Sequence, residues 1–175
     1  MIPKKRGAII TVGSLHVTLG SEPRLYAPDF KRSTQSFDAA KGAILNLTRA
    51  LACEFAQHDI TVNCISPGAD TQTHLDAVTR ENFRNMVPLG RLGVPTDLNG
   101  AVALFACAGG RSITGQNLTV DGGWSASWSC SIAGHPKKKF RGLSGQRPTQ
   151  ASLRFLRRTA RLSPSVSAQS CNVPF

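Results

Sequence analysis

The sequence predicts an α/β fold in which short parallel strands are joined by helices. Three observations lead to this prediction: a strand pattern at residues 8–12, a helical periodicity over residues 38–57 and a second strand pattern at residues 60–66. Two nearly all-apolar strands separated by a long amphipathic helix are typical of a β-α-β crossover in a parallel sheet. We therefore expect a parallel sheet with both faces covered.

The helix between these strands gives the strongest periodic signal in the chain. Asp38 is expected to be its N-cap, and the helix is expected to end near residues 57–59. The spacing of apolar residues predicts a helix of about twenty residues with one wide buried face. That face would consist of Ala40, Ala43, Ile44, Leu47, Leu51 and Phe55.

The remaining elements follow in order along the chain. The first strand is closed by Ser14, and the second stops at the turn Pro67-Gly68. Residues 74–86 and 96–107 predict two further helices, the latter capped by Thr96, and residues 116–120 predict a last strand. Gly109-Gly110 and Gly122-Gly123 are interpreted as turns. In total we expect three parallel strands and about four helices.

The net charge of +11 is distributed very unevenly along the 175 residues. Residues 1–126 hold 12 of the 21 Lys and Arg residues and all 10 acidic residues, whereas residues 127–175 hold the other nine cations. Ser, Pro, Gln and Arg dominate this second segment, which is typical of a disordered tail. A basic tail can bind RNA or anionic lipid. We favour the alternative that it is unselected sequence, such as a shifted reading frame, so nucleic-acid binding is not expected.

Cysteine usage and hydropathy indicate a cytoplasmic protein. The five cysteines show neither paired nor metal-ligand spacing, so no metal site is expected, and those within predicted elements are interpreted as small buried hydrophobes in a reducing compartment. No segment approaches the roughly 20 apolar residues of a membrane span. The basic, partly apolar start also fits a signal peptide, but the predicted strand explains the same residues and a clear cleavage site is missing.

Several segments, taken in order, resemble the short-chain dehydrogenase/reductase family. They lie within residues 7–126 and comprise residues 9–14, 39–43, 47–54, 62–68, 88–95, 113–116 and 120–124. The gluconate and 3-oxoacyl-carrier-protein reductase group is the most similar part of that family. The resemblance implies the carboxyl-terminal part of a doubly wound, Rossmann-like parallel sheet. It also implies an oxidoreductase that transfers hydride between NAD or NADP and a small alcohol or ketone.

The resemblance also implies a set of site residues. Ser14 would polarise the substrate oxygen, Tyr26 would act as the acid/base, and Lys41 would lower the tyrosine pKa and bind the nicotinamide ribose. The turn Pro67-Gly68 would abut the nicotinamide. Thr71, or alternatively Thr73, would bind its carboxamide. Residues 74–93 are similar to the mobile segment that closes over the substrate in this family.

The tyrosine-lysine motif departs from the family pattern. Phe37, which has no proton to give, stands four residues before Lys41. Tyr26 follows Ser14 at the family's interval, and deleting residues 28–38 would restore Tyr-x-x-x-Lys. We therefore interpret residues 28–38 as an insertion loop that interrupts the start of the helix. Whether Tyr26 or Phe37 takes the tyrosine position stays open at this point.

The glycine-rich pyrophosphate loop of the family is a second departure. No G-x-x-x-G-x-G precedes Ala8 and no Asn-Asn-Ala-Gly follows it, so we expect a domain truncated at its amino end. Two hypotheses remain. The chain is an impaired or inactive oxidoreductase, or it is a non-catalytic remnant or interaction module. In either case, family members pair through the long helix and the last strand, which implies a homo-oligomer.

Overall fold

The computed structural model describes residues 1–30, 35–70 and 74–127, which contain a three-stranded parallel sheet. The strands β1 (Gly7–Val12), β2 (Ile60–Pro67) and β3 (Asn117–Val120) lie in the order β1-β2-β3. In register, Gly7 pairs with Ile60, and Cys64 pairs with Asn117. The predicted three parallel strands are confirmed, and their carboxyl ends meet at one edge of the sheet.

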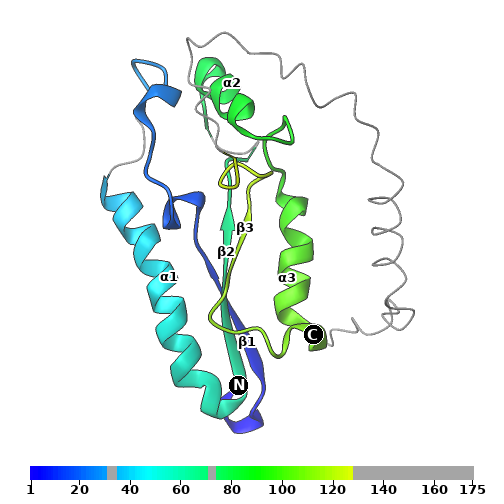
Figure 1. Cartoon of the computed structure of the whole chain (residues 1–175). Helices are drawn as coiled ribbons and strands as arrows, with labels where there is room; N and C mark the ends of the chain where they lie inside the picture. The colour runs from blue at the N-terminus through cyan, green and yellow to red at the C-terminus, as the bar shows by residue number, and fades with distance from the viewer. Residues whose placement is uncertain (31–34, 71–73, 128–175) are drawn as a thin grey trace, which may run out of the picture.

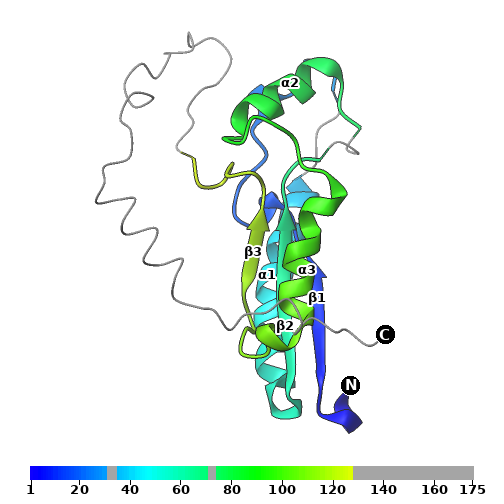
Figure 2. The same cartoon turned by 90° about the vertical axis from the view of Figure 1, so that its right-hand side faces the viewer.

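Helices cover both faces of this sheet. Figures 1 and 2 show α1 (Gln35–Phe55) against one face and α3 (Asn99–Ala106) against the other. The third helix, α2 (Ala77–Met86), lies beyond the carboxyl ends of the strands. This layering is the predicted Rossmann-like arrangement, and it leaves the carboxyl edge of the sheet to be closed by loops and by α2.

The start of α1 differs from the sequence prediction. The helix begins at Gln35, so Asp38 lies inside its first turn and is not the N-cap. The Asp38 carboxylate instead accepts hydrogen bonds from the Ser21 backbone N–H at 3.2 Å and from the Ser21 hydroxyl at 3.0 Å. Residues 35–38 of the predicted insertion are therefore helical, and residues 31–34 lie outside the described residues.

The buried face of α1 also differs from the prediction. Thr48 and Ala52 are its buried residues, whereas 52% of Leu47 is exposed, and Ala40 and Ala43 are exposed as well. A threonine can face the sheet here because its hydroxyl is hydrogen-bonded to the Thr11 hydroxyl at 2.7 Å, so neither polar group is left unpaired. The apolar periodicity identified the helix, but it could not identify a polar pair within the helix-sheet contact.

The elements after β2 are shorter than predicted. A 3-10 turn, Pro95–Leu98, precedes α3, so Thr96 lies inside this turn and does not cap the helix. Asp97 orders the turn, because its carboxylate accepts a hydrogen bond from the Val94 N–H at 2.9 Å. The described residues contain three α-helices where about four were expected.

The glycine pair after β3 forms the predicted turn. Gly122 and Gly123 have φ angles of 65° and 91°, which glycine adopts at little steric cost. A Cβ on Gly122 would lie 2.5 Å from Cγ1 of Val87. The turn therefore packs closely against the chain that leaves α2, which fixes α2 over the end of the sheet.

The central strand β2 holds the core together. Val62, Asn63 and Cys64 are fully buried. The Asn63 side chain donates to the Ile113 carbonyl at 2.7 Å and accepts from the Gln116 N–H at 3.0 Å, which ties β2 to the chain that leads into β3. Because the amide nitrogen and the amide oxygen each have a hydrogen-bond partner, this polar side chain can lie in the interior without an unsatisfied group.

The predicted burial of the cysteines is correct for one of the three in the described residues. Cys64 is buried, Cys53 is exposed and Cys107 is partly buried, and all three are free thiols. Cys130 and Cys171 lie outside the described residues, as does nearly all of the predicted tail 127–175. No helix in the described part of the chain is long and apolar enough to cross a bilayer.

Candidate functional site

Ser14 lies where the sequence places it, at the carboxyl end of β1. The preceding Gly13 donates its N–H to the Ile65 carbonyl at 2.8 Å, and a Cβ on Gly13 would lie 2.6 Å from the Ser66 hydroxyl oxygen. The chain can therefore run close to β2 up to Ser14. The Ser14 hydroxyl then accepts a hydrogen bond from the His16 N–H at 3.2 Å and caps a 3-10 turn, Leu15–Val17.

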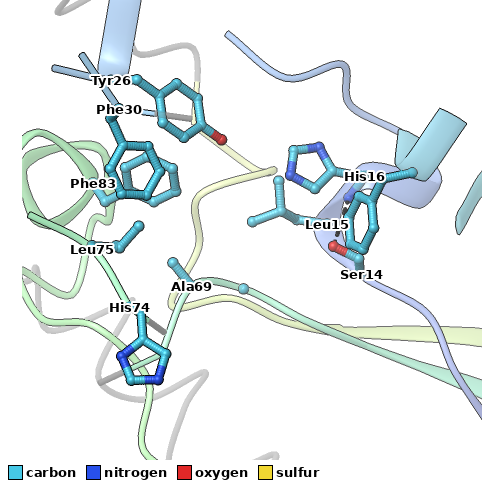
Figure 3. A pocket seen from close by; sticks show the side chains of 11 residues that line it. Ser14, Leu15, His16, Tyr26, Phe30, Ala69, His74, Leu75 and Phe83 are labelled. Carbon is cyan, nitrogen blue, oxygen red and sulfur yellow. Dashed lines mark hydrogen bonds between the residues drawn. The ribbon is translucent and has the colours of Figure 1, made fainter. Parts of the chain in front are cut away.

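A cavity of about 330 Å³ opens beside Ser14 (Figure 3). Four of the predicted or alternative site residues line it, and they come from different segments: Ser14, Tyr26, Phe37 and Gly68. Its volume is at the lower end of the range for small-molecule sites. The other residues that line the cavity are Leu15, His16, Phe30, Ala69, His74, Leu75 and Phe83.

Tyr26 belongs to the wall of the cavity nearest α2. It follows a 3-10 turn, Pro23–Leu25, and its ring stacks on Phe30 at 5.7 Å and meets the edge of Phe83 at 5.4 Å between centroids. In Figure 3 its hydroxyl points away from these two rings and into the cavity. Ser14 and Tyr26 therefore face the same cavity from separate segments.

Lys41 is placed differently. It lies on α1, donates from Nζ to the Val12 carbonyl at 3.2 Å, and is not among the residues that line the cavity. Its Nζ lies 5.7 Å from the centroid of the Phe37 ring, one helical turn earlier. On α1, the position four residues before Lys41 is thus held by Phe37, while Tyr26 belongs to another segment.

The predicted nicotinamide contacts lie around the end of β2. Pro67 is the last residue of β2, and Gly68 lines the cavity and donates its N–H to the Val120 carbonyl at 3.0 Å. A Cβ on Gly68 would lie 2.9 Å from Cα of Asp121, so glycine is needed here for contact with the neighbouring chain. Thr71 and Thr73 lie outside the described residues.

His16 lines the cavity but was not among the site residues predicted from the sequence. Its Nδ1 lies 3.4 Å from Oδ1 of Asp38 and 3.5 Å from the Ser21 hydroxyl. The available signal was its place two residues after Ser14, at the strand edge where open parallel sheets bind ligands. Asp38 was predicted to cap the helix, and this role gave no reason to expect its contact with the His16 imidazole.

Two arginines in the segment from α2 to the turn before α3 are paired with carboxylates. Arg91 hydrogen-bonds Asp97 at 2.6 Å, which lowers the pKa of this carboxyl to about 2. Arg84 lies 2.8 Å from Glu81 on α2. Both arginines are thus engaged in ion pairs. Within the described ranges, no cluster of three or more His, Cys, Asp or Glu residues could hold a metal ion.

Comparison with known proteins agrees with the fold. A family model described as "Enoyl-(Acyl carrier protein) reductase" matches residues 1–125. The chain belongs to the short-chain dehydrogenase/reductase family. Its resemblance to the gluconate and 3-oxoacyl-carrier-protein reductase group is confirmed by the relatives and solved structures described next.

Curated relatives from several bacteria match the same part of the chain. Galactitol 2-dehydrogenase (L-tagatose-forming) of Cereibacter sphaeroides is 34% identical over 130 residues, which are 71% of this chain and 48% of that protein. The 3-oxoacyl-[acyl-carrier-protein] reductase FabG of Chlamydia trachomatis is 35% identical over 127 residues, 70% of this chain and 47% of the relative. The chain spans about half the length of these relatives.

Solved structures show the same relationship. A short-chain dehydrogenase from Leptospira borgpetersenii with bound NAD+ is 33% identical, with a TM-score of 0.64 over 70% of this chain and 46% of that one. A gluconate 5-dehydrogenase from Burkholderia cenocepacia in complex with NADP and tartrate is 28% identical, with a TM-score of 0.62. The match covers 72% of this chain and 48% of that one. The fold class is thereby confirmed as part of a Rossmann-like α/β fold.

Proposed function

We propose that this chain is the substrate-side half of an oxidoreductase that transfers hydride between NAD or NADP and an alcohol or ketone, and that this activity is impaired in the chain as it stands. Membership of the family and the bound NAD+ and NADP of its structural neighbours support the cofactor class. The proposed impairment rests on the position of Phe37, whose ring centroid lies 5.7 Å from Nζ of Lys41, where the family uses a tyrosine.

The residues present fit only one end of a dinucleotide. The cavity beside Ser14 and Gly68 could accept a nicotinamide-sized ring, with Lys41 near the same strand end. A pyrophosphate needs backbone N–H groups in a glycine-rich turn at a helix N-terminus. In the described segments, no strand leads through such a turn directly into an α-helix. The whole cofactor therefore does not fit this set of residues, and we derive no step of the reaction through it.

The chemistry that the chain's own residues supply is limited by the position of Tyr26. Ser14 can hydrogen-bond a substrate oxygen at the sheet edge, and Tyr26 directs its hydroxyl into the same cavity. General acid catalysis, however, needs a donor whose pKa is suited to the reaction. The lysine that would tune such a phenol lies next to Phe37 and bonds the Val12 carbonyl.

Titration of the full chain with NADH and NADPH, followed by nicotinamide fluorescence, tests this proposal. We expect no binding in the low-micromolar range, because the pyrophosphate would lack its donors. An intact family member serves as the positive control. Low-micromolar binding, accompanied by NADPH-dependent reduction of a ketone, would contradict the proposed impairment.

The alternative of a non-catalytic interaction module is supported by one surface. The outer face of α1 exposes 52% of Leu47 and also Ala40 and Ala43, and β3 forms one edge of the sheet. We propose that two copies associate through α1 and β3, which would bury this apolar face.

Leu47→Glu should shift the chain toward monomer in analytical ultracentrifugation. The exposed Asn46→Glu on the same helix is the control, and an unchanged mass with Leu47→Glu would exclude this surface.

A further inference from the structure

The cavity beside Ser14 has one rigid aromatic wall. The Phe83 ring meets Tyr26 at 5.4 Å and Trp124 at 5.0 Å in edge-to-face geometry, and Tyr26 stacks on Phe30 at 5.7 Å. Phe83 and Trp124 are both buried, with 7% and 8% of their surface exposed. Phe83 and Trp124 belong to one of the hydrophobic core clusters and Tyr26 packs against it, so this part of the wall is formed before any ligand binds.

The opposite side of the cavity carries polar groups. Ser14 and His16 lie across from the Tyr26, Phe30 and Phe83 rings in Figure 3. The imidazole is only 11% exposed, and its Nδ1 lies 3.4 Å from the Asp38 carboxylate. Ser21 fixes that carboxylate in turn through two hydrogen bonds, at 3.0 and 3.2 Å. The histidine is therefore held in one orientation by groups on its Nδ1 side.

This arrangement determines what the second ring nitrogen can bind. A carboxylate beside Nδ1 favours the tautomer with the proton on Nδ1, which makes Nε2 of a neutral imidazole an acceptor. An acceptor suits an alcohol O–H, and the Ser14 hydroxyl can donate to a ketone oxygen. Both oxidation states of one substrate can thus find a partner on this side of the cavity.

The charge of the lining excludes other ligand classes. Among the lining residues in the described part of the chain there is no Lys, Arg, Asp or Glu. A phosphate or carboxylate would lose its hydration without gaining a charged partner. The polar side chains of the lining are Ser14, His16, Tyr26 and His74, so a polyol would have to place its remaining hydroxyls against phenylalanine and leucine side chains.

We infer that this cavity binds a compact aryl ketone or aryl alcohol, with its ring against Phe30 and Phe83 and its oxygen between Ser14 and His16. The inference rests on the proposed function, because it names the substrate class of the same site. The size is suitable: an engineered apolar cavity of about 150 Å³ holds benzene, and this cavity is about 330 Å³. His16 is assigned as a binding and specificity residue.

Isothermal titration calorimetry on the full chain tests the inference without a cofactor. The probes are acetophenone and 1-phenylethanol, compared with galactitol and gluconate. We expect both aryl probes to bind at least about tenfold more tightly than either polyol, the factor that corresponds to a modest difference in binding free energy. His16→Leu should weaken 1-phenylethanol binding by about tenfold, because the alcohol loses its hydrogen-bond partner.

Matched variants separate binding from folding. His58→Leu changes a histidine in the 3-10 turn Ala56–His58, beyond the far end of α1, and should leave binding unchanged. Phe37→Ala should weaken binding because Phe37 lines the cavity, while Leu47→Ala on the same helix should not. Both Phe37 and Leu47 are more than a third exposed, so these variants are expected to fold. His16→Gln, which keeps a hydrogen-bonding group, should bind more tightly than His16→Leu.

The outcomes distinguish this inference from the proposed function. Equal or tighter binding of the polyols, or no binding of either aryl probe, would overturn the inference and leave the oxidoreductase proposal standing. Aryl binding that depends on His16, in a protein that never reduces a ketone even with a complete cofactor half, would support the inference and contradict the oxidoreductase proposal.

Discussion

In the family, one tyrosine carries the acid/base hydroxyl and stands four residues before the lysine. In this chain, Tyr26 has the hydroxyl and Phe37 has the position. Phe37 has the helical position next to Lys41, with Nζ 5.7 Å from its ring, but it has no hydroxyl. Tyr26 has the hydroxyl and faces the cavity from an aromatic cluster on another segment. The hydroxyl and the ammonium that should tune it are therefore supplied by separate parts of the chain.

This division predicts the behaviour of an introduced phenol. The chain contains one tyrosine, so the double variant Phe37→Tyr with Tyr26→Phe again has a single phenol, now one helical turn before Lys41. We expect its pKa to lie about one unit below the usual value near 10, because a cation close to a partly exposed phenol stabilises the phenolate. The measurement is a titration of phenolate absorbance.

Lys41→Gln in the same background provides the control. If the lysine is the cause, this change should return the phenol pKa to its usual range. A pKa near 10 in the double variant, unaffected by Lys41→Gln, would show that the ammonium of Lys41 stays with the Val12 carbonyl and does not influence position 37.

At the scale of elements, the segment between α2 and α3 is ordered by one ion pair. Asp97 accepts hydrogen bonds from Arg91 at 2.6 and 3.0 Å and from the Val94 N–H at 2.9 Å. The Arg91 hydrogen bond is the largest cause of the lowered Asp97 pKa, about 2. The carboxylate thus connects the loop at Arg91 to the 3-10 turn that leads into α3.

The lowered pKa predicts how stability depends on pH. Because the folded pKa is below the unfolded value near 4, the contribution of Asp97 is fully present above pH 4 and is lost as the pH falls toward 2. Asp97→Asn should therefore reduce the loss of stability between these pH values, as measured by urea unfolding. The effect is expected to be small because the pair is open to solvent, with 54% of the Arg91 and 28% of the Asp97 side chain exposed.

Glu22 offers a comparison for this experiment. Arg24 lowers its pKa to about 2 as well, but the two residues are only two positions apart and can also meet in the unfolded chain. Glu22→Gln should change the pH dependence less than Asp97→Asn does. The reverse order would contradict the assignment of the Asp97 pair as an ordering contact.

The same elements show what the sequence could and could not predict. The strands were predictable because β-branched runs stop at a serine or at Pro-Gly, and the helix because its apolar spacing is sustained over six turns. The face that α1 buries was not predictable, since the Thr48-Thr11 hydroxyl pair forms only when sheet and helix meet. For the same reason the His16-Asp38 contact could not be predicted, because it joins a strand end to a helix start through Ser21.

At the scale of the whole molecule, the described residues form the cavity beside Ser14 and a sheet whose β1 edge has no strand beyond it among them. The relatives are about twice as long as the matched part. A chimera with a family-type amino-terminal half would supply the glycine loop and a neighbour for β1. It therefore tests the proposed lack of cofactor binding separately from the proposed displacement of the tyrosine from Lys41.

We expect that chimera to bind NADPH and to reduce ketones only slowly. Placing a phenol beside Lys41, either by Phe37→Tyr or by deleting residues 28–38, should then raise kcat by about a hundred- to ten-thousand-fold, the usual value of a positioned general acid. Of the two changes, Phe37→Tyr is expected to act more strongly, because the deletion also removes Asp38 and so releases His16. In the deletion chimera, Tyr26→Phe should abolish the gain. If the unmodified chimera is already fast and Tyr26→Phe alone stops it, Tyr26 reaches the substrate from its own turn, and the position of Phe37 beside Lys41 is no defect.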